Sequence, residues 1–219
     1  MTPLFSPLVE RAIEIAAEWH DGTYRKGRWS DPCVRDAGDA PSRVPAMAHV
    51  TAVALTVQRA GWGDDAVAAA FLHDALEDAN RHGDALARAA LVALVGEPVT
   101  RIVEAVSEPK RDADGAWLPW RVRKEAYLTT LAAGPVEAVA VSLADKLHNA
   151  YSMASSLECG IDIFTSAPGR RGLSAGAADQ QWFFEAVLAE SRSADDARLV
   201  PMRERLRAEV DRFVAASAG

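Results

Sequence analysis

The sequence of 219 residues has few cysteines and no long hydrophobic run. Its two cysteines, Cys33 and Cys159, lie far apart and match no zinc spacing, which argues against a disulfide framework or a zinc finger. They are interpreted as ordinary thiols in a reducing compartment. No stretch reaches the length of about 20 apolar residues that spans a membrane, and the first residues lack the pattern of a secretory signal. We therefore expect a cytoplasmic protein that does not bind membranes.

Positive charge is also scarce. Lys and Arg number 24 against 31 Asp and Glu, for a net charge of -7. Binders of nucleic acid or of anionic membrane surfaces need an extended positive field, so both classes are disfavoured. A small phosphorylated ligand needs only a local cluster of Lys and Arg, and it is the partner we expect. The sequence sets no oligomeric state.

Internal repeats and strand-like alternation are absent as well. Apolar residues make up 49% of the chain, which is rich in Ala and Leu, and apolar positions recur at helical spacing. The sequence thus predicts an all-α fold, a compact bundle of about eight or nine helices forming a single domain over residues 1–219, with a core of about 6–190 and a C-terminal helix. The predicted helices cover residues 7–20, 46–60, 64–79, 84–95, 98–106, 120–133, 136 onward, 179–190 and 195–216.

Three segments rich in Gly, Pro, Ser and charged residues interrupt this pattern. Residues 23–45 and 107–119 are predicted to be loops, and residues 159–178 are predicted to be a disordered insertion rather than a mobile flap. In the first loop, Arg25 and Lys26 directly follow a helix. Such a pair suits a phosphate or a stacked base, and the alternative is a solvated basic pair.

Residues 71–79 are expected to carry the chemistry. Read as a helix, they place Leu72, Ala75 and Leu76 on one stripe and His73, Asp74, Glu77 and Asp78 on the other side. No cation lies between Asp65 and Arg81 in the sequence. A divalent metal would balance this charge, because His nitrogens and Asp oxygens are typical ligands of first-row ions.

Two further residues are predicted to complete such a site. His49 lies beside the apolar stripe of helix 46–60, where a core histidine is the alternative. Asp145 lies in the apolar run of the helix that begins at residue 136, where an unpaired carboxylate is costly to bury. Asn149 shares its face, whereas Lys146 is expected to point elsewhere. Two imidazoles and two carboxylates suit Mn²⁺, Fe²⁺ or Zn²⁺, with positions left for water and a phosphate oxygen.

A lone His, then His-Asp, then a distant Asp is an order that resembles the HD phosphohydrolase superfamily. Residues 72–78, LHDALED, resemble the HDxxED motif of the Rel/Spo-type alarmone hydrolases, and residues 143–149, LADKLHN, look like their second signature. Arg25 and Lys26 fall where that family has an Arg-Lys pair. The similarity covers about residues 12–188 and leaves no room for a synthetase domain. The chain is therefore most similar to small stand-alone hydrolases of the metazoan SpoT homologue type.

The resemblance implies an HD-domain helical bundle that removes the 3′-diphosphate of ppGpp or pppGpp as pyrophosphate. It implies one divalent ion, with Mn²⁺ expected first and Fe²⁺, Zn²⁺ or Mg²⁺ as alternatives. The implied ligands are His49, His73, Asp74 and Asp145. Glu77 and Asp78 would orient or deprotonate the attacking water.

The resemblance also implies contacts to a nucleotide. Arg25 would stack on the purine, Lys26 would meet phosphate or base, and Asn149 would contact the sugar. Three further cations are candidates for the distal phosphates, with ordinary surface residues as the alternative: Lys110, Arg123 and Lys124.

The chain departs from the family pattern near the expected base-binding side. Residues 44–50, VPAMAHV, lack the Tyr and the second Pro of the family's Pro-Tyr-Ile-x-His-Pro run, and Tyr24 stands where Gln is frequent. Residues 27–44 replace a shorter connection. Two alternatives therefore stay open: hydrolysis of another nucleotide or a phosphomonoester, and a catalytically silent nucleotide-binding regulator. Retention of both the four ligands and the Glu77–Asp78 pair argues against the regulator.

Overall fold

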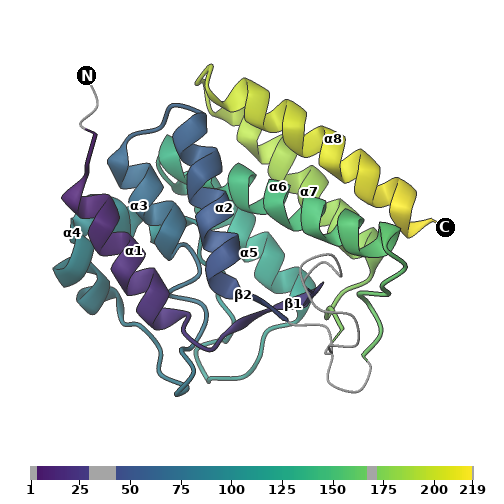
Figure 1. The fold of residues 1–219 in the computed structure, drawn as a ribbon, viewed down its shortest axis with the longest axis horizontal. Helices are drawn as coiled ribbons and strands as arrows, with labels where there is room; N and C mark the ends of the chain where they lie inside the picture. Colours follow the sequence, from purple (N-terminus) through teal and green to yellow (C-terminus); the bar gives the residue numbers. More distant parts are fainter. Residues whose placement is uncertain (1–3, 30–42, 167–171, 219) are drawn as a thin grey trace, which may run out of the picture.

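The computed structural model describes residues 4–29, 43–166 and 172–218, and the side chains of residues 26–29 are outside the described part. The predicted all-α class is confirmed, with 66% helix and 4% strand. The elements, shown in Figure 1, are α1 (Pro7–Trp19), β1 (Tyr24–Trp29), β2 (Arg43–Pro45), α2 (Ala46–Arg59), α3 (Asp64–Leu72), α4 (Arg88–Ala105), α5 (Trp120–Ala133), α6 (Val136–Glu158), α7 (Ala177–Glu190), the 3₁₀ helix η2 (Ser191–Ser193) and α8 (Leu199–Ser217).

Several predicted helix ends follow from local chemistry. The Ser6 hydroxyl caps α1 by accepting a hydrogen bond from the Val9 N–H at 3.3 Å, and Pro7 opens the helix. Helix α2 stops just before Gly61, whose φ of +85° favours glycine. Helix α4 combines the two predicted helices 84–95 and 98–106, with a break at Gly96 (φ +84°), and it begins at Arg88 rather than Asp84.

The prediction that one helix carries the whole 71–79 stretch is wrong. Helix α3 ends at Leu72, and the chain then forms turns, with the Ala75 N–H bonded to the Leu72 carbonyl at 2.9 Å and the Asp78 N–H to the Asp74 carbonyl at 2.9 Å. Residues 66–72 are all buried, so α3 crosses the core. Of the polar residues that follow, His73 stays buried, whereas Asp74, Glu77 and Asp78 line a cavity.

Two of the loop predictions, for residues 23–45 and 159–178, also need correction. The ends of the predicted loop 23–45 form an antiparallel strand pair in which Tyr24 faces Pro45 and Trp29 faces Arg43, so the expectation of no strands was wrong. The described parts of 159–178 are not a disordered insertion, because Ile163 is buried and its carbonyl accepts a hydrogen bond from the Leu173 N–H at 2.9 Å. Both pairings join residues that are far apart in the sequence, which local composition does not reveal.

Helix α6 runs through the middle of the bundle. It packs most extensively against α8 and also contacts α2, α3, α4 and α7, while α3 is covered by α1, α2 and α4 (Figure 1). The central helices share one hydrophobic core. The carboxyl end of α3, the first turn of α2 and the middle of α6 therefore meet inside the molecule, and both α2 and α6 contact strand β1.

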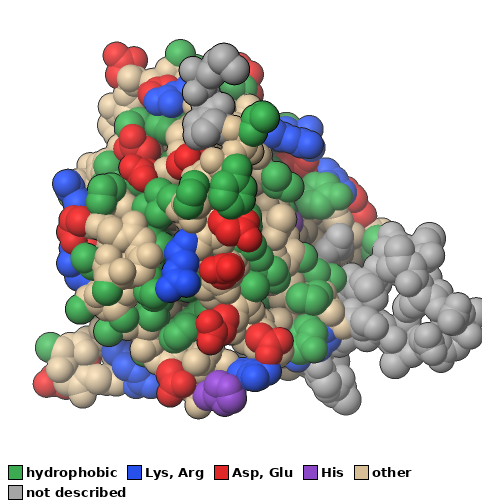
Figure 2. Space-filling view, turned by 60° about the vertical axis from the view of Figure 1, so that its left-hand side comes forward, with side chains coloured by type: hydrophobic (Ala, Val, Ile, Leu, Met, Phe, Trp, Pro, Cys, Tyr) green, Lys and Arg blue, Asp and Glu red, His purple; other side chains and the backbone are tan. Residues whose placement is uncertain are grey.

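The surface is mixed in charge. On the face shown in Figure 2, the described acidic side chains are interspersed with basic and hydrophobic ones, so this face presents no continuous positive surface of the kind that nucleic acid requires. Across the described part of the chain, no helix combines the length and the apolar character needed to cross a bilayer.

Gly134 provides a test of the packing between α4 and α5. A Cβ at this position would lie 2.5 Å from the Cβ of Ala105, whereas a Cβ at Gly63 would meet nothing within 4 Å. We expect G134A to lower the free energy of unfolding by about 1–3 kcal/mol, because the buried end of α4 must shift. Urea denaturation measures it, with G63A as the control, expected to cost less than about 1 kcal/mol. Equal losses in the two variants would contradict this packing.

Candidate metal centre

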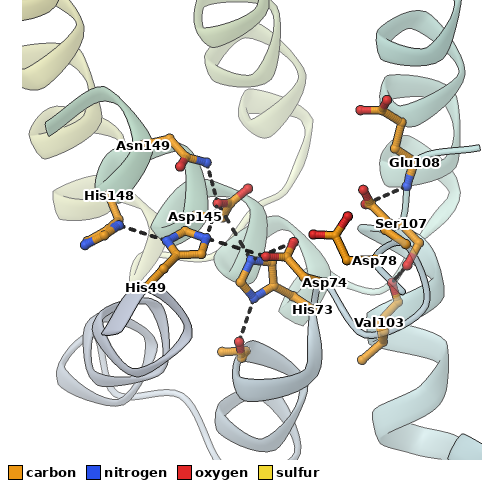
Figure 3. A network of polar contacts seen from close by, with 12 residues as sticks. His49, His73, Asp74, Asp78, Val103, Ser107, Glu108, Asp145, His148 and Asn149 are labelled. Carbon is orange, nitrogen blue, oxygen red and sulfur yellow. Dashed lines mark hydrogen bonds and ion pairs between the residues drawn. The ribbon is translucent and has the colours of Figure 1, made fainter. Parts of the chain in front are cut away.

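The four predicted ligands meet at one point of the core. His49 comes from α2, His73 and Asp74 directly follow α3, and Asp145 comes from α6. Figure 3 shows their polar atoms pointing toward one another. The Nε2 atom of His49 lies 3.1 Å from an Asp145 oxygen and 3.8 Å from an Asp74 oxygen, and Nε2 of His73 lies 3.2 Å from Asp74 and 3.7 Å from Asp145.

The imidazoles are oriented as metal ligands are. The Nδ1 atom of His73 donates to the Ala70 carbonyl at 2.7 Å, which leaves Nε2 as the nitrogen on which a metal would replace the proton. That Nε2 is buried and has no hydrogen-bond partner. In His49, Nδ1 contacts Nδ1 of His148 at 2.8 Å, so Nε2 again faces the carboxylates. A metal ion would give both nitrogens the partner they are positioned for.

Asp145 is held by residues of its own helix. Its side chain is 9% exposed, and its Oδ2 accepts a hydrogen bond from the Lys146 ammonium at 2.5 Å. The expectation that Lys146 points elsewhere was wrong: its stem packs in the core and its ammonium turns back to the neighbouring carboxylate. The Asn149 amide donates to Oδ1 at 2.6 Å, as the shared helix face predicted. Asp145 is therefore both neutralised and fixed in direction.

The electrostatics fit a bound cation. Burial alone would lower the pKa of His73, but Asp74 and Asp145 outweigh it and raise this pKa to about 9. Burial and the Arg25 guanidinium lower the pKa of His49 well below its usual value. Burial opposes ionisation of Asp145, yet Lys146 and the two imidazoles hold its pKa well below the usual range. Two carboxylates and two imidazoles thus form an electron-rich set for a divalent first-row ion.

The donor set has the spacing of a metal site. Ligand atoms of His49, His73 and Asp74 all lie within 4.8 Å of one another, and Asp145 adjoins both imidazoles. Mixed nitrogen and oxygen donors suit Mn²⁺, Fe²⁺ and Zn²⁺ without selecting among them. The residues present therefore fit a divalent metal, and its identity stays a prediction.

Glu77 and Asp78 occupy different surroundings beside this centre. The Oε1 atom of Glu77 accepts a hydrogen bond from the Glu108 N–H at 2.7 Å. Burial, together with the negative charge of Asp74, raises the pKa of Glu77 to about 8. The Asp78 side chain is 55% exposed, and its Oδ1 accepts from the Lys110 ammonium at 2.5 Å. Glu77 is thus the more buried acid of the pair, and Asp78 is the exposed one.

A cavity of about 820 Å³ opens over the centre. Arg25 and Asn149 line it together, with the Arg25 guanidinium donating to the Asn149 side-chain oxygen at 2.7 Å. Lys110, Arg123 and Lys124 also line it, so the structure gathers these predicted contacts around one space. Lys26 lies in strand β1, and its side chain falls outside the described residues.

Two cavity residues were missed from the sequence. Glu108 is 7% exposed, and its carboxylate accepts hydrogen bonds from both Arg123 and Lys124, so these cations are held in place and partly neutralised. His20, expected only as a helix end, lines the cavity and is 5% exposed. Burial lowers the pKa of His20 despite the nearby Asp74 and Asp78. Neither residue was predicted to belong to the site, and the packing of α1, α4 and α5 places them here.

Comparisons with known proteins agree with this architecture. A family model described as HD domain matches residues 28–163. The structure of lmo0812 from Listeria monocytogenes EGD-e is similar with a TM-score of 0.61 and 24% identity, over 77% of this chain and 98% of that chain. A metazoan ortholog of SpoT, described as hydrolyzing ppGpp and playing a role in starvation responses, is similar with a TM-score of 0.60 and 20% identity, over 98% and 97%. No curated protein matches.

Replacing Asp74 by Ala tests the metal centre. We expect D74A to weaken Mn²⁺ binding by at least about 100-fold, because loss of a ligand should exceed the 10- to 100-fold effect of losing a supporting residue. Titration calorimetry measures the affinity, and circular dichroism checks that the helices are retained. The control is D65A, which removes an exposed carboxylate from the first turn of α3. Unfolding of D74A with unchanged metal affinity in the remaining folded fraction would instead indicate a purely structural ion cluster.

Proposed function

Because this chain belongs to the HD domain family, we propose that it is a metal-dependent phosphohydrolase that removes the 3′-diphosphate of ppGpp or pppGpp as pyrophosphate. The observation that carries the proposal is the meeting of His49, His73, Asp74 and Asp145 at the base of a cavity lined by cations. Family membership supports the metal-dependent hydrolase. The alarmone substrate rests on the sequence motifs and on the similarity to the metazoan SpoT ortholog.

The four ligands would hold one divalent ion, which when bound supplies a Lewis acid and lowers the pKa of water. The role of the protein is to place groups around it. Asp145 and the two imidazoles are fixed from outside by Lys146, the Ala70 carbonyl and His148, so the donors are preorganised. Little rearrangement is then needed to present the open side of the centre to a phosphate.

Glu77 is the proposed general base. It follows Asp74 by one short turn, and the Glu108 N–H fixes one of its oxygens, leaving the other side of the carboxylate toward the cavity. A raised pKa suits a group that takes and returns a proton near neutral pH. Asp78, which pairs with Lys110, assists by holding that cation at the cavity edge and by orienting water or the leaving group.

Substrate contacts follow from the charges along the cavity. Arg25 and Asn149 are joined to each other beside the metal ligands, where they would meet the purine and the sugar. Arg123 and Lys124 lie on α5 at the cavity wall and would neutralise phosphates, together with Lys110 and Lys26. A volume of about 820 Å³ is ample for a nucleotide carrying two diphosphates.

A second candidate is hydrolysis of another nucleotide or a phosphomonoester at the same centre. It is favoured by the departures in residues 44–50 and by the exposed Tyr24, which Arg43 covers with its guanidinium 4.9 Å from the ring centre. These residues adjoin the expected base-binding side. A silent nucleotide-binding regulator is disfavoured because both the ligand set and the perturbed Glu77 are present together.

The substrate is tested directly by incubating the Mn²⁺-loaded protein with ppGpp. We expect release of pyrophosphate and formation of GDP. Ion-exchange chromatography measures both products. A panel of other purine nucleotides and a phosphomonoester runs alongside, and the chelated protein is the control. Turnover of a different compound with ppGpp left intact would overturn the alarmone assignment while keeping the hydrolase. Absence of any turnover in a folded, metal-loaded sample would favour the regulator.

The substitution Glu77→Gln tests the proposed general base separately from metal binding. Gln keeps the oxygen that accepts from the Glu108 N–H but removes the titrating carboxylate. We expect kcat to fall by about 10²- to 10⁴-fold, the usual contribution of a general base, with Mn²⁺ affinity changed less than about 10-fold. The matched control is E125Q on the exposed side of α5. If E77Q retains full kcat, Glu77 is not the base.

A further inference from the structure

His20 is a buried polar residue of the cavity wall that the proposed chemistry leaves without a role. It is 5% exposed and lines the cavity. Its Nε2 atom is buried and has no hydrogen-bond partner, a property that it shares with Nε2 of the predicted metal ligand His73. A buried polar atom without a partner costs about 1–3 kcal/mol, so an unpaired nitrogen at a site wall indicates a ligand group that supplies the missing bond.

The backbone around His20 is firmly attached to the segment that carries Asp74 and Glu77. The preceding Trp19 donates from its indole N–H to the Asp78 carbonyl at 2.8 Å. The His20 N–H bonds to the Ala16 carbonyl at 2.9 Å, and its own carbonyl accepts from the Thr23 hydroxyl at 2.8 Å. The first bond ties the end of α1 to residues 73–78, and the other two fix the turn that follows α1. The imidazole is therefore a fixed part of the wall rather than a mobile surface group.

The nearby carboxylates are already directed to other groups. Asp74 presents its two oxygens to His73 and His49, at 3.2 and 3.8 Å, and Asp78 accepts from Lys110 at 2.5 Å. His20 is close enough to feel the charges of Asp74, His73 and Asp78. An acceptor that enters the cavity is thus the natural partner of Nε2. In a phosphohydrolase, that acceptor is an oxygen of the phosphate group.

We propose that His20 is a further substrate-binding residue, which donates a hydrogen bond from Nε2 to an oxygen of the phosphate group that lies over the metal centre. The proposal rests on the proposed function and adds a donor from the end of α1 to the cations that α5 contributes to the same cavity. An imidazole N–H adds a directional donor near Asp74 and Asp78, whereas a Lys or Arg at the end of α1 would form ion pairs with these carboxylates. His20 therefore selects phosphate by geometry rather than by charge.

Three substitutions separate this role from a structural one. In H20Q the side-chain amide nitrogen reaches roughly the place of Nε2, in H20N it reaches roughly the place of Nδ1, and H20A has no donor. We expect H20A and H20N to weaken binding of inorganic phosphate to the Mn²⁺-loaded protein by about 10- to 100-fold, as for a lost hydrogen bond to a charged group. H20Q should recover at least half of this loss on a logarithmic scale. Titration calorimetry with inorganic phosphate measures it.

Controls keep the result specific. Mn²⁺ affinity and thermal unfolding are measured for each variant, and His82, exposed in the turn near Arg81, is replaced by Ala as a histidine outside the cavity. The proposal requires that Mn²⁺ affinity is unchanged in all variants. It also requires that H20Q binds phosphate more tightly than H20A and H20N do. Equal phosphate affinity in wild type and H20A, or equal weakening in H20A, H20N and H20Q, would overturn it. Because phosphate binding is measured without turnover, failure of ppGpp hydrolysis would refute the proposed substrate and leave this test intact.

Discussion

The structure depends on one buried carboxylate. Asp145 lies in the middle of the central helix α6, where an isolated negative charge would be strongly destabilising. Its Oδ2 is taken by Lys146, and its Oδ1 faces His49, His73 and Asn149. Helices α2 and α3 must therefore approach α6 with their histidines directed inward. The cluster that pairs this buried carboxylate is also the set of donors predicted to bind a divalent metal.

Because α3 ends at Leu72, Asp74 and Glu77 have different surroundings and different proposed roles. In a continuous helix, Asp74 and Glu77 would be three residues apart on one face and would point the same way. The turns after Leu72 instead direct Asp74 to the imidazoles and Glu77 to the Glu108 N–H. One carboxylate becomes part of the donor set, and the other is left to a buried environment that raises its pKa. The proposed separation of ligand and base is thus a consequence of where the helix stops.

An acidic protein can still offer a local site for phosphate. The Glu108 carboxylate accepts hydrogen bonds from Arg123 and Lys124 at the cavity wall, and Lys110 donates to Asp78. Each cation is paired with a carboxylate, so the wall carries oriented donors without a large excess of positive charge. This arrangement agrees with a net charge of -7 and with a small anionic ligand rather than a polyanion.

The sequence by itself determined most of the helices and the four predicted ligands. Helical periodicity and the caps at Ser6 and Gly61 are local signals, and buried His and Asp residues inside apolar runs stand out because their burial is costly. The resemblance to the HD motif predicts that these residues bind a metal. For these features, the information lies within a few residues of each position.

Only the tertiary structure decided the rest. The β1–β2 pair, the end of α3 at Leu72 and the contact of Lys146 with Asp145 all depend on partners that packing supplies. Glu108 and His20 were not predicted as site residues, and they enter the cavity because α1, α4 and α5 bring them to the 73–78 turn. The neighbours of a side chain across the core are fixed by how whole helices pack. The periodicity along one helix does not predict these neighbours.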